Sequence, residues 1–234
     1  MRKLILVGIV LLALAGIGAA SAAANLIKNG GFEAPVNAHA WDVYFDSTPF
    51  LEWHVELGLG SPNPVPTTVL PTLEIQNEDA IGLKPAEGLQ FAELDSYANV
   101  NISQVITLNT AKKYHISFNQ SCRDDDNGLP SILGVYLNDA LLSKTYCGGT
   151  SNPAPRIWTL HTIDVIPAAN GPAKLTFADE GISNSYGVLL DDVKLEDDGI
   201  QQVPIPEFPA VALPVGFIVG VLGAVFYIRS TRES

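Results

Sequence analysis

Basic residues are scarce in this sequence. Lysine and arginine together number 13, against 25 aspartate and glutamate residues, so the net charge is −12. This balance excludes the basic surface that nucleic-acid binding requires. Charged residues make up only 16% of the chain, which argues against a salt-saturated halophilic surface. We therefore interpret most of the carboxylates as solvated surface groups.

The sequence also lacks the common catalytic motifs. It has no Gly-x-Ser-x-Gly turn, no His-Glu-x-x-His pair and no Gly-rich phosphate loop. The few histidines are scattered along the chain, at His39, His54, His115 and His161. We therefore predict that the protein is not an enzyme. Glu93 and Asp95 fall on the same side of an expected strand, and paired carboxylates can hydrolyse glycosides, so a surface glycosidase is kept as a distant alternative.

The N-terminus has the pattern of a secretory signal. Arg2 and Lys3 precede an apolar run over residues 4–18, and small residues follow. This order of charged, apolar and small residues predicts a cleaved signal peptide at residues 1–24, with an uncleaved anchor as the alternative.

The C-terminus has the pattern of a membrane anchor. Residues 208–228 carry no charge, and a helix of this length spans about 30 Å of hydrocarbon. Arg229 and Arg232 follow, and basic residues beside a span stay on the cytoplasmic side. We predict a transmembrane helix at 208–228, a cytoplasmic tail at 229–234, a linker at 199–207 and an outward-facing domain at 25–198.

Cysteine is nearly absent, with two residues in the whole chain. Both Cys122 and Cys147 lie in the part predicted to be exported, where thiols are commonly oxidised. Structural zinc usually needs four ligands, so two cysteines favour one disulfide between them. Two buried thiols are the alternative.

The domain itself has the periodicity of β-strands. Tyr114, Ile116 and Phe118 alternate with polar residues, which is typical of a half-buried strand. Similar runs occupy 100–108, 132–137, 158–165, 173–177 and 187–195, with turn residues between them. No amphipathic helix of three turns intervenes, so we predict an all-β antiparallel sandwich or jelly roll, with Phe118 and Trp158 facing inward. One or two further strands are expected within 36–73.

Five segments in this order carry a resemblance to a known family. They are "NLIKNGGFEAP", "GLQFAELDS", "NISQVITL", "YHISFNQSCR" and "GVLLDDVKLE". Together they resemble the galactose-binding-like jelly rolls, which include many carbohydrate-binding modules. The end of the chain, with Pro206, Glu207 and Phe208 before the apolar run, is similar to the PEF-CTERM sorting tail of archaeal surface proteins, which an archaeosortase processes.

The family resemblance implies a structural Ca²⁺ ion. In these jelly rolls a glutamate of the first motif and an aspartate of the last strand meet beside the metal, and the matching positions are Glu33, Asp191 and Asp192. Carboxylate and carbonyl oxygens are the ligands that calcium prefers. The alternative is that these side chains only cap or flank strands.

Aromatic residues and one sheet face are candidates for glycan contact. An exposed ring can cover the apolar side of a sugar, and Trp41, Tyr44 and Trp53 are the better exposed candidates. His115 and Asn119 share the strand face opposite Phe118, which is either a sugar-binding surface or a solvated one. Asn101 and Asn119 each begin an N-glycosylation triplet.

These observations predict an exported, membrane-anchored cell-surface protein. Its jelly-roll domain is expected to bind a polysaccharide or cell-envelope glycan, or to mediate adhesion. The alternative is a purely structural, glycosylated envelope protein without a ligand site.

Overall fold

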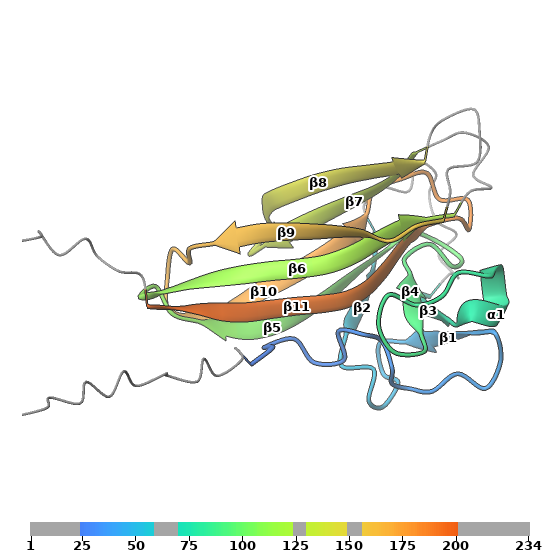
Figure 1. Cartoon of the computed structure of the whole chain (residues 1–234), viewed down its shortest axis with the longest axis horizontal. Coiled ribbons are helices and arrows are strands. Elements are labelled where there is room, and N and C mark those ends of the chain that lie inside the picture. Colours follow the sequence, from blue (N-terminus) through green and yellow to red (C-terminus); the bar gives the residue numbers. More distant parts are fainter. Residues whose placement is uncertain (1–23, 59–69, 124–129, 149–155, 201–234) are drawn as a thin grey trace, which may run out of the picture.

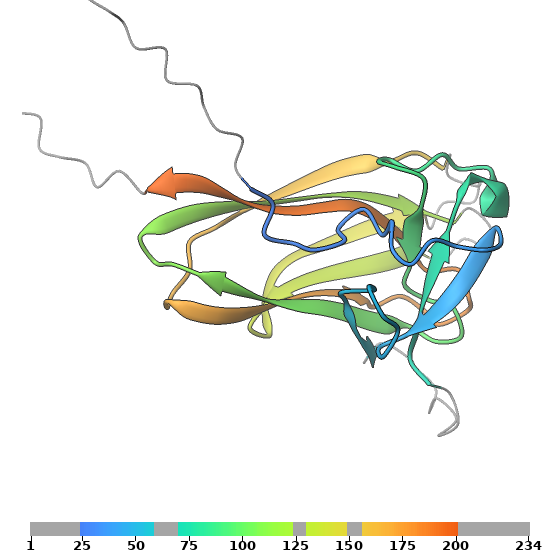
Figure 2. The same cartoon turned by 90° about the horizontal axis from the view of Figure 1, so that it is seen from below.

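The chain folds as a sandwich of two antiparallel β-sheets (Figures 1 and 2). The computed structural model describes residues 24–58, 70–123, 130–148 and 156–200. Within these ranges the single helix is the short α1 (Glu78–Ile81), so the predicted all-β class is confirmed. None of the described residues forms a helix long and apolar enough to cross a membrane. The signal sequence, the Pro-Glu-Phe motif and the span at 208–228 fall in undescribed parts of the chain and stay predictions.

The two sheets differ in size. The six-stranded sheet, called sheet A, has the order β1 (Trp41–Phe45), β3 (Thr72–Gln76), β4 (Phe91–Glu93), β11 (Val188–Ile200), β6 (Lys112–Cys122) and β9 (Thr159–Val165). The five-stranded sheet B has the order β2 (His54–Leu57), β5 (Val100–Leu108), β10 (Gly171–Asp179), β7 (Pro130–Leu137) and β8 (Ala140–Gly148). Sequence neighbours are often separated in the sheets, so most strand pairs join distant segments.

The core follows from the alternation of side chains along the strands. On β6, Tyr114, Ile116 and Phe118 are buried while His115 is half-buried, as the period of two predicts. Phe118 meets Phe177 of β10 edge to face, with ring centroids 5.3 Å apart, so the two sheets interlock through aromatic rings.

Trp158 departs from its predicted position. It precedes β9 and lies half-buried outside the main core, where its ring meets Phe91 with centroids 5.5 Å apart. Its indole N–H donates to the carbonyl of Lys84 at 2.7 Å. A polar partner at the rim of the sheet therefore holds this ring on the outer face, and the expectation that Trp158 points inward is wrong.

The segment at residues 25–30 pairs with the last strand. The N–H of Leu26 donates to the carbonyl of Leu195 at 2.8 Å, and the N–H of Val193 donates to the carbonyl of Gly30 at 2.9 Å. A Cβ on Gly30 would lie 2.0 Å from the Val193 carbonyl oxygen, so only glycine permits this approach. The glycine-rich start of the domain is thus explained by close backbone packing.

Cys122 and Cys147 lie together where the two sheets meet. Cys122 ends β6 of sheet A, Cys147 is on β8 at the edge of sheet B, and the structure holds both as thiols. A hydrogen bond with Cys122, together with burial, raises the pKa of the Cys147 thiol. Gln120 bridges the same gap, accepting from Thr145 Oγ1 at 2.6 Å. The disulfide stays a prediction, and the fold brings its two residues into contact.

Oxidation of this pair is expected to stabilise the sandwich. Closing a loop of about 25 residues should add about 3 kcal/mol to the free energy of unfolding, because the unfolded chain loses conformational freedom. Melting of the full chain with and without reductant measures the effect, and Cys147→Ser should abolish the response to reductant. A peptide map in which both cysteines are alkylated without prior reduction would exclude the bond.

Candidate functional site

The outer face of sheet B carries a cleft of about 630 Å³. Its floor is formed by β5 and β10, and β2 and β7 contribute its walls. The lining residues are mostly polar: Glu56, Leu57, Asn101, Tyr136, Asp139, Lys174, Thr176, Ala178 and Glu180. These positions face outward because their neighbours along the strands, such as Val135 and Leu175, are buried in the core.

One wall of the cleft is organised around Glu180. The hydroxyl of Tyr136 donates to Oε1 of Glu180, and the ammonium of Lys144 pairs with Oε2. The hydrogen bond to Glu180, with burial, raises the pKa of Tyr136, so the phenol stays protonated at neutral pH. Gly134 leaves the space for this contact, since a Cβ there would lie 2.3 Å from Glu180 Oε1. The tyrosine ring is therefore held in a fixed position in the wall.

The opposite wall is organised around Glu56. Its carboxylate pairs with Lys174 at 3.4 Å and with His54 Nε2 at 2.9 Å. Burial raises the pKa of Glu56, but its hydrogen bonds with His54 and Lys174 outweigh that effect and lower it. Beyond His54 a second hollow of about 400 Å³ continues over Ser103 and Val105. Glu56 and Asn101 are paired and line the first hollow. His54 and Ser103, two positions along the same strands, are paired and line the second, so the two hollows are neighbours on one face.

This arrangement suits a neutral, hydroxyl-rich ligand. Three of the four charged side chains that line the cleft are already in ion pairs, Glu56 with Lys174 and Glu180 with Lys144, so a charged ligand would have to compete with these pairs. Asn101, Glu56 and Lys174 offer donors and acceptors to hydroxyl groups, and Tyr136 offers an aromatic ring.

The three aromatic residues predicted to contact a glycan do not meet at this cleft. Trp41 is 50% exposed, but it lies on β1 at the edge of sheet A. Tyr44 packs against the core, and its hydroxyl donates to Asn37 Oδ1 at 3.0 Å. Trp53 is 2% exposed, so the expectation that this ring is on the surface is wrong. The three rings could not be told apart from the sequence because all of them lie in the Pro-rich section, which shows little periodicity.

The residues predicted to bind calcium hold a loop instead. Glu33 Oε1 accepts from the N–H groups of Leu89 and Gln90, at 2.7 and 2.9 Å. Asp191 Oδ2 accepts from the N–H groups of Ala86 and Glu87, at 2.7 and 3.0 Å. Both carboxylates therefore anchor the segment 86–90.

The third predicted ligand is also engaged. Asp192 pairs with the ammonium of Lys194 at 2.7 Å, and Asp191 Oδ1 accepts from the Asp192 N–H at 2.6 Å. With these oxygens facing N–H donors and an ammonium group, the donor set as arranged does not fit a calcium ion. The calcium site stays a prediction, and the contacts of Glu33, Asp191 and Asp192 among the described residues do not support it.

The two predicted glycosylation residues lie on different sheets. Asn119 is half-buried on the outer face of sheet A, which it shares with His115. Asn101 lines the cleft on sheet B. A glycan attached to Asn101 would therefore occupy the space of a ligand, so modification of Asn101 and ligand binding exclude each other.

Glu93 and Asp95 are poorly placed for glycoside hydrolysis. Both are buried, at 0% and 1% exposure, and neither lines the cleft. Glu93 pairs with Arg123 Nη1 at 2.8 Å, and Asp95 accepts from the N–H groups of Asn184 and Ser185 at 2.7 and 2.9 Å. Their contacts hold the structure around them.

Comparison with known proteins identifies the fold. No family model and no curated protein matches the sequence. The Stig cyclase Fisc from Fischerella sp. TAU, solved with (3Z)-3-(1-methyl-2-pyrrolidinylidene)-3H-indole, has a TM-score of 0.55 at 15% identity, over 77% of this chain and all of the cyclase. An apo cyclase from Fischerella sp. has a TM-score of 0.51 at 16% identity, over 76% of this chain and 97% of the other. The carbohydrate-binding module TmCBM61, solved with β-1,4-galactotriose, has a TM-score of 0.40 at 20% identity, over 75% and 99%.

The two cyclase structures support the β-sandwich fold and correct the prediction that the protein is not an enzyme. The two cyclases are enzymes that share this fold, so the absence of common catalytic motifs does not exclude catalysis here. At these identities the likeness shows the fold alone, because one fold serves many unrelated functions. The function must be argued from the side chains of the chain itself.

Proposed function

We propose that this chain is an exported, membrane-anchored surface protein whose sandwich domain binds a glycan in the cleft on sheet B. The observation that carries the proposal is the pairing of a fixed aromatic ring, Tyr136, with polar side chains across a cleft of about 630 Å³. The signal sequence and the anchor of the proposal rest on the terminal sequence patterns, as does processing by an archaeosortase-like enzyme.

Binding at one cleft is expected to be weak. An open groove leaves much of a sugar in water, and its hydroxyl groups must exchange water for protein partners. Many anchored copies engaging one polymer would raise the overall strength without new contacts. A linear or branched envelope polysaccharide is therefore a better partner than a free monosaccharide.

Retention on immobilised glycans tests the proposal. The purified full chain, displayed multivalently, is expected to be retained on some envelope or extracellular polysaccharide. Tyr136→Ala should reduce retention at least about tenfold, because the ring is lost from the wall, and Lys174→Ala should also reduce it. Tyr136→Phe keeps the ring and should retain more binding than Tyr136→Ala.

Trp41→Ala is the matched control, because it removes an exposed aromatic ring outside the cleft. Loss of retention in Trp41→Ala with full retention in Tyr136→Ala would place binding elsewhere. No retention of the folded protein on any glycan would favour the structural envelope alternative. Mass analysis of the recovered glycan distinguishes binding from cleavage.

A further inference from the structure

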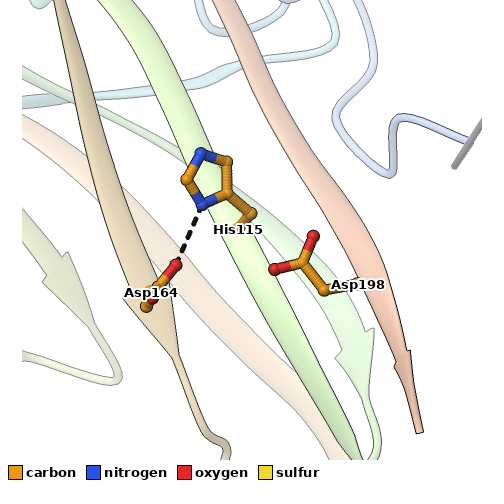
Figure 3. Close-up of side chains that lie close together, drawn as sticks. All are labelled: His115, Asp164 and Asp198. Carbon is orange, nitrogen blue, oxygen red and sulfur yellow. Dashed lines mark hydrogen bonds and ion pairs between the residues drawn. The ribbon is translucent and has the colours of Figure 1, made fainter.

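Three side chains that can bind a metal converge on the outer face of sheet A, on the opposite side of the sandwich from the cleft. His115 comes from β6, Asp164 from β9 and Asp198 from β11 (Figure 3). One ligand atom from each lies within 4.8 Å of the other two, and no other group of three does so in the part of the chain that the structure describes.

The strand pairing fixes this convergence. His115 lies directly opposite Asp164 on β9 and opposite Glu196 on β11. Directly opposed residues have Cβ atoms about 5 Å apart and point to the same face. The irregular pairing after Asp197 then carries Asp198 to the same place. His115 and Asp164 therefore face each other on regularly paired strands, and Asp198 joins them from the irregular end of β11.

The three ligand atoms are near enough for one metal ion to gather them after side-chain rotation. In a tetrahedral site with metal–ligand distances of about 2.0–2.2 Å, the ligand atoms lie about 3.3–3.6 Å apart. The atoms here lie within 4.8 Å of one another, so rotation of the exposed side chains must bring them about 1 Å closer. One imidazole nitrogen with two carboxylate oxygens is a donor set for Zn²⁺ and neighbouring transition metals, whereas calcium and magnesium prefer oxygen alone.

We propose that His115, Asp164 and Asp198 form a surface site for a divalent transition-metal ion such as Zn²⁺. Three protein ligands leave a fourth position open to water or to an external ligand. The proposal is independent of glycan binding, because no residue of this site lines the cleft.

The ammonium group of Lys113 competes with such an ion for the carboxylate of Asp164. Its ammonium lies 2.7 Å from Asp164 Oδ2, while His115 Nδ1 lies 3.0 Å from Asp164 Oδ1. The hydrogen bond from Lys113, followed by that of His115, lowers the pKa of Asp164, so this carboxylate is ionised at neutral pH. A metal ion must displace the ammonium from Asp164, which predicts tighter binding when Lys113 is removed.

Two other histidines show why this group stands apart. His39 Nδ1 also lies 3.0 Å from a carboxylate, that of Asp42, but no third ligand joins them among the described residues. His54 contacts two carboxylates through opposite ring nitrogens, Asp46 at Nδ1 and Glu56 at Nε2. One ion cannot bind both nitrogens of a single ring, so His54 cannot gather its two carboxylates around a metal.

Titration of the purified full chain with Zn²⁺, monitored by calorimetry, tests the site. Co²⁺ bound by the same ligands gives a visible absorption signature. One equivalent of metal is expected. His115→Ala and Asp198→Asn should each weaken binding at least about tenfold, since even indirect support of a metal ligand is worth that much. Lys113→Ala should tighten it. All three residues are at least partly exposed, so folding should persist, and melting curves check this.

His39→Ala is the matched control and should leave the affinity unchanged. Equal weakening by His39→Ala and His115→Ala would show scattered surface binding and overturn the proposal. Wild-type binding no tighter than that of His115→Ala would overturn it as well. Glycan retention is measured with and without Zn²⁺. Because no residue of the metal site lines the cleft, retention should be the same in both cases.

Discussion

Replacing Trp53 with alanine is expected to lower the free energy of unfolding by about 3–5 kcal/mol. The side chain is 2% exposed and lies between two aromatic rings, stacked on Phe32 at 5.6 Å and edge to face with Phe177 at 6.1 Å. Its indole N–H donates to the carbonyl of Asn29 at 3.0 Å. Truncation would remove this packing and leave a cavity between the sheets. Denaturant unfolding of the full chain, followed by circular dichroism, measures the loss.

Trp41→Ala provides the comparison, because Trp41 is the same residue type at 50% exposure. Its replacement should cost no more than about 1 kcal/mol, as for most exposed positions. Trp53→Phe keeps most of the buried ring and should fall between the two. Equal losses for Trp41→Ala and Trp53→Ala would contradict the placement of Trp53 in the core.

Most strands from residue 100 onward could be predicted because their signal is local. The run over residues 100–108 matches β5 in both bounds, and Tyr114 to Phe118 shows the alternation of β6 directly. β8 was not predicted from the sequence. The turn before it is made by Asn138 and Asp139, which both adopt positive φ, at 48° and 63°. Asn and Asp favour such hairpin turns, so this residue pair between two apolar runs is the sequence signal for β8.

The strands before residue 100 were harder to predict because they are short and separated by irregular segments. β1, β2 and β4 have five, four and three residues, too few to establish a period. The sequence indicated one or two strands within 36–73 without placing them. These segments depend on contacts with distant strands, since β4 lies between β3 and β11.

The cleft could not be predicted for the same reason. Tyr136 and Glu180 lie 44 positions apart, and Lys174 meets Glu56 across 118 positions. Which outward positions become neighbours depends on the order β2, β5, β10, β7, which no local pattern encodes. The sequence instead favours tryptophan as the residue type for contact with a glycan. Trp53, one of the three candidates, is a core residue.

Three buried carboxylates anchor the segment that leads into β11. Glu93, Asp95 and Asp179 accept hydrogen bonds from backbone N–H groups within 181–188. Burial raises the pKa of all three, to about 8 for Glu93 and about 7 for Asp179. The positive charge of Arg123 opposes this effect at Glu93 but does not cancel it.

These raised pKa values predict that the fold is more stable at mildly acidic pH than at alkaline pH. The folded state binds protons more tightly than the unfolded state, so the stabilisation is fully present below the unfolded pKa and is lost as pH rises through the folded pKa. For Glu93 this window runs from 4.5 to about 8 and corresponds to on the order of 5 kcal/mol. The free energy of unfolding should therefore fall by several kcal/mol between about pH 5 and about pH 8.5.

Glu93→Gln separates this carboxylate from the other titrating groups. Glutamine has nearly the same size but no charge to bury, so its unfolding free energy should depend much less on pH in this window. The loss of one hydrogen-bond acceptor acts at every pH and shifts the whole curve, so the slope with pH is the quantity to compare. Glu78→Gln removes an exposed carboxylate on α1 and is the matched control, which should keep the wild-type slope. Parallel curves for the wild type and Glu93→Gln would show that Glu93 is ionised in the folded protein throughout this range, with Arg123 compensating its burial in full.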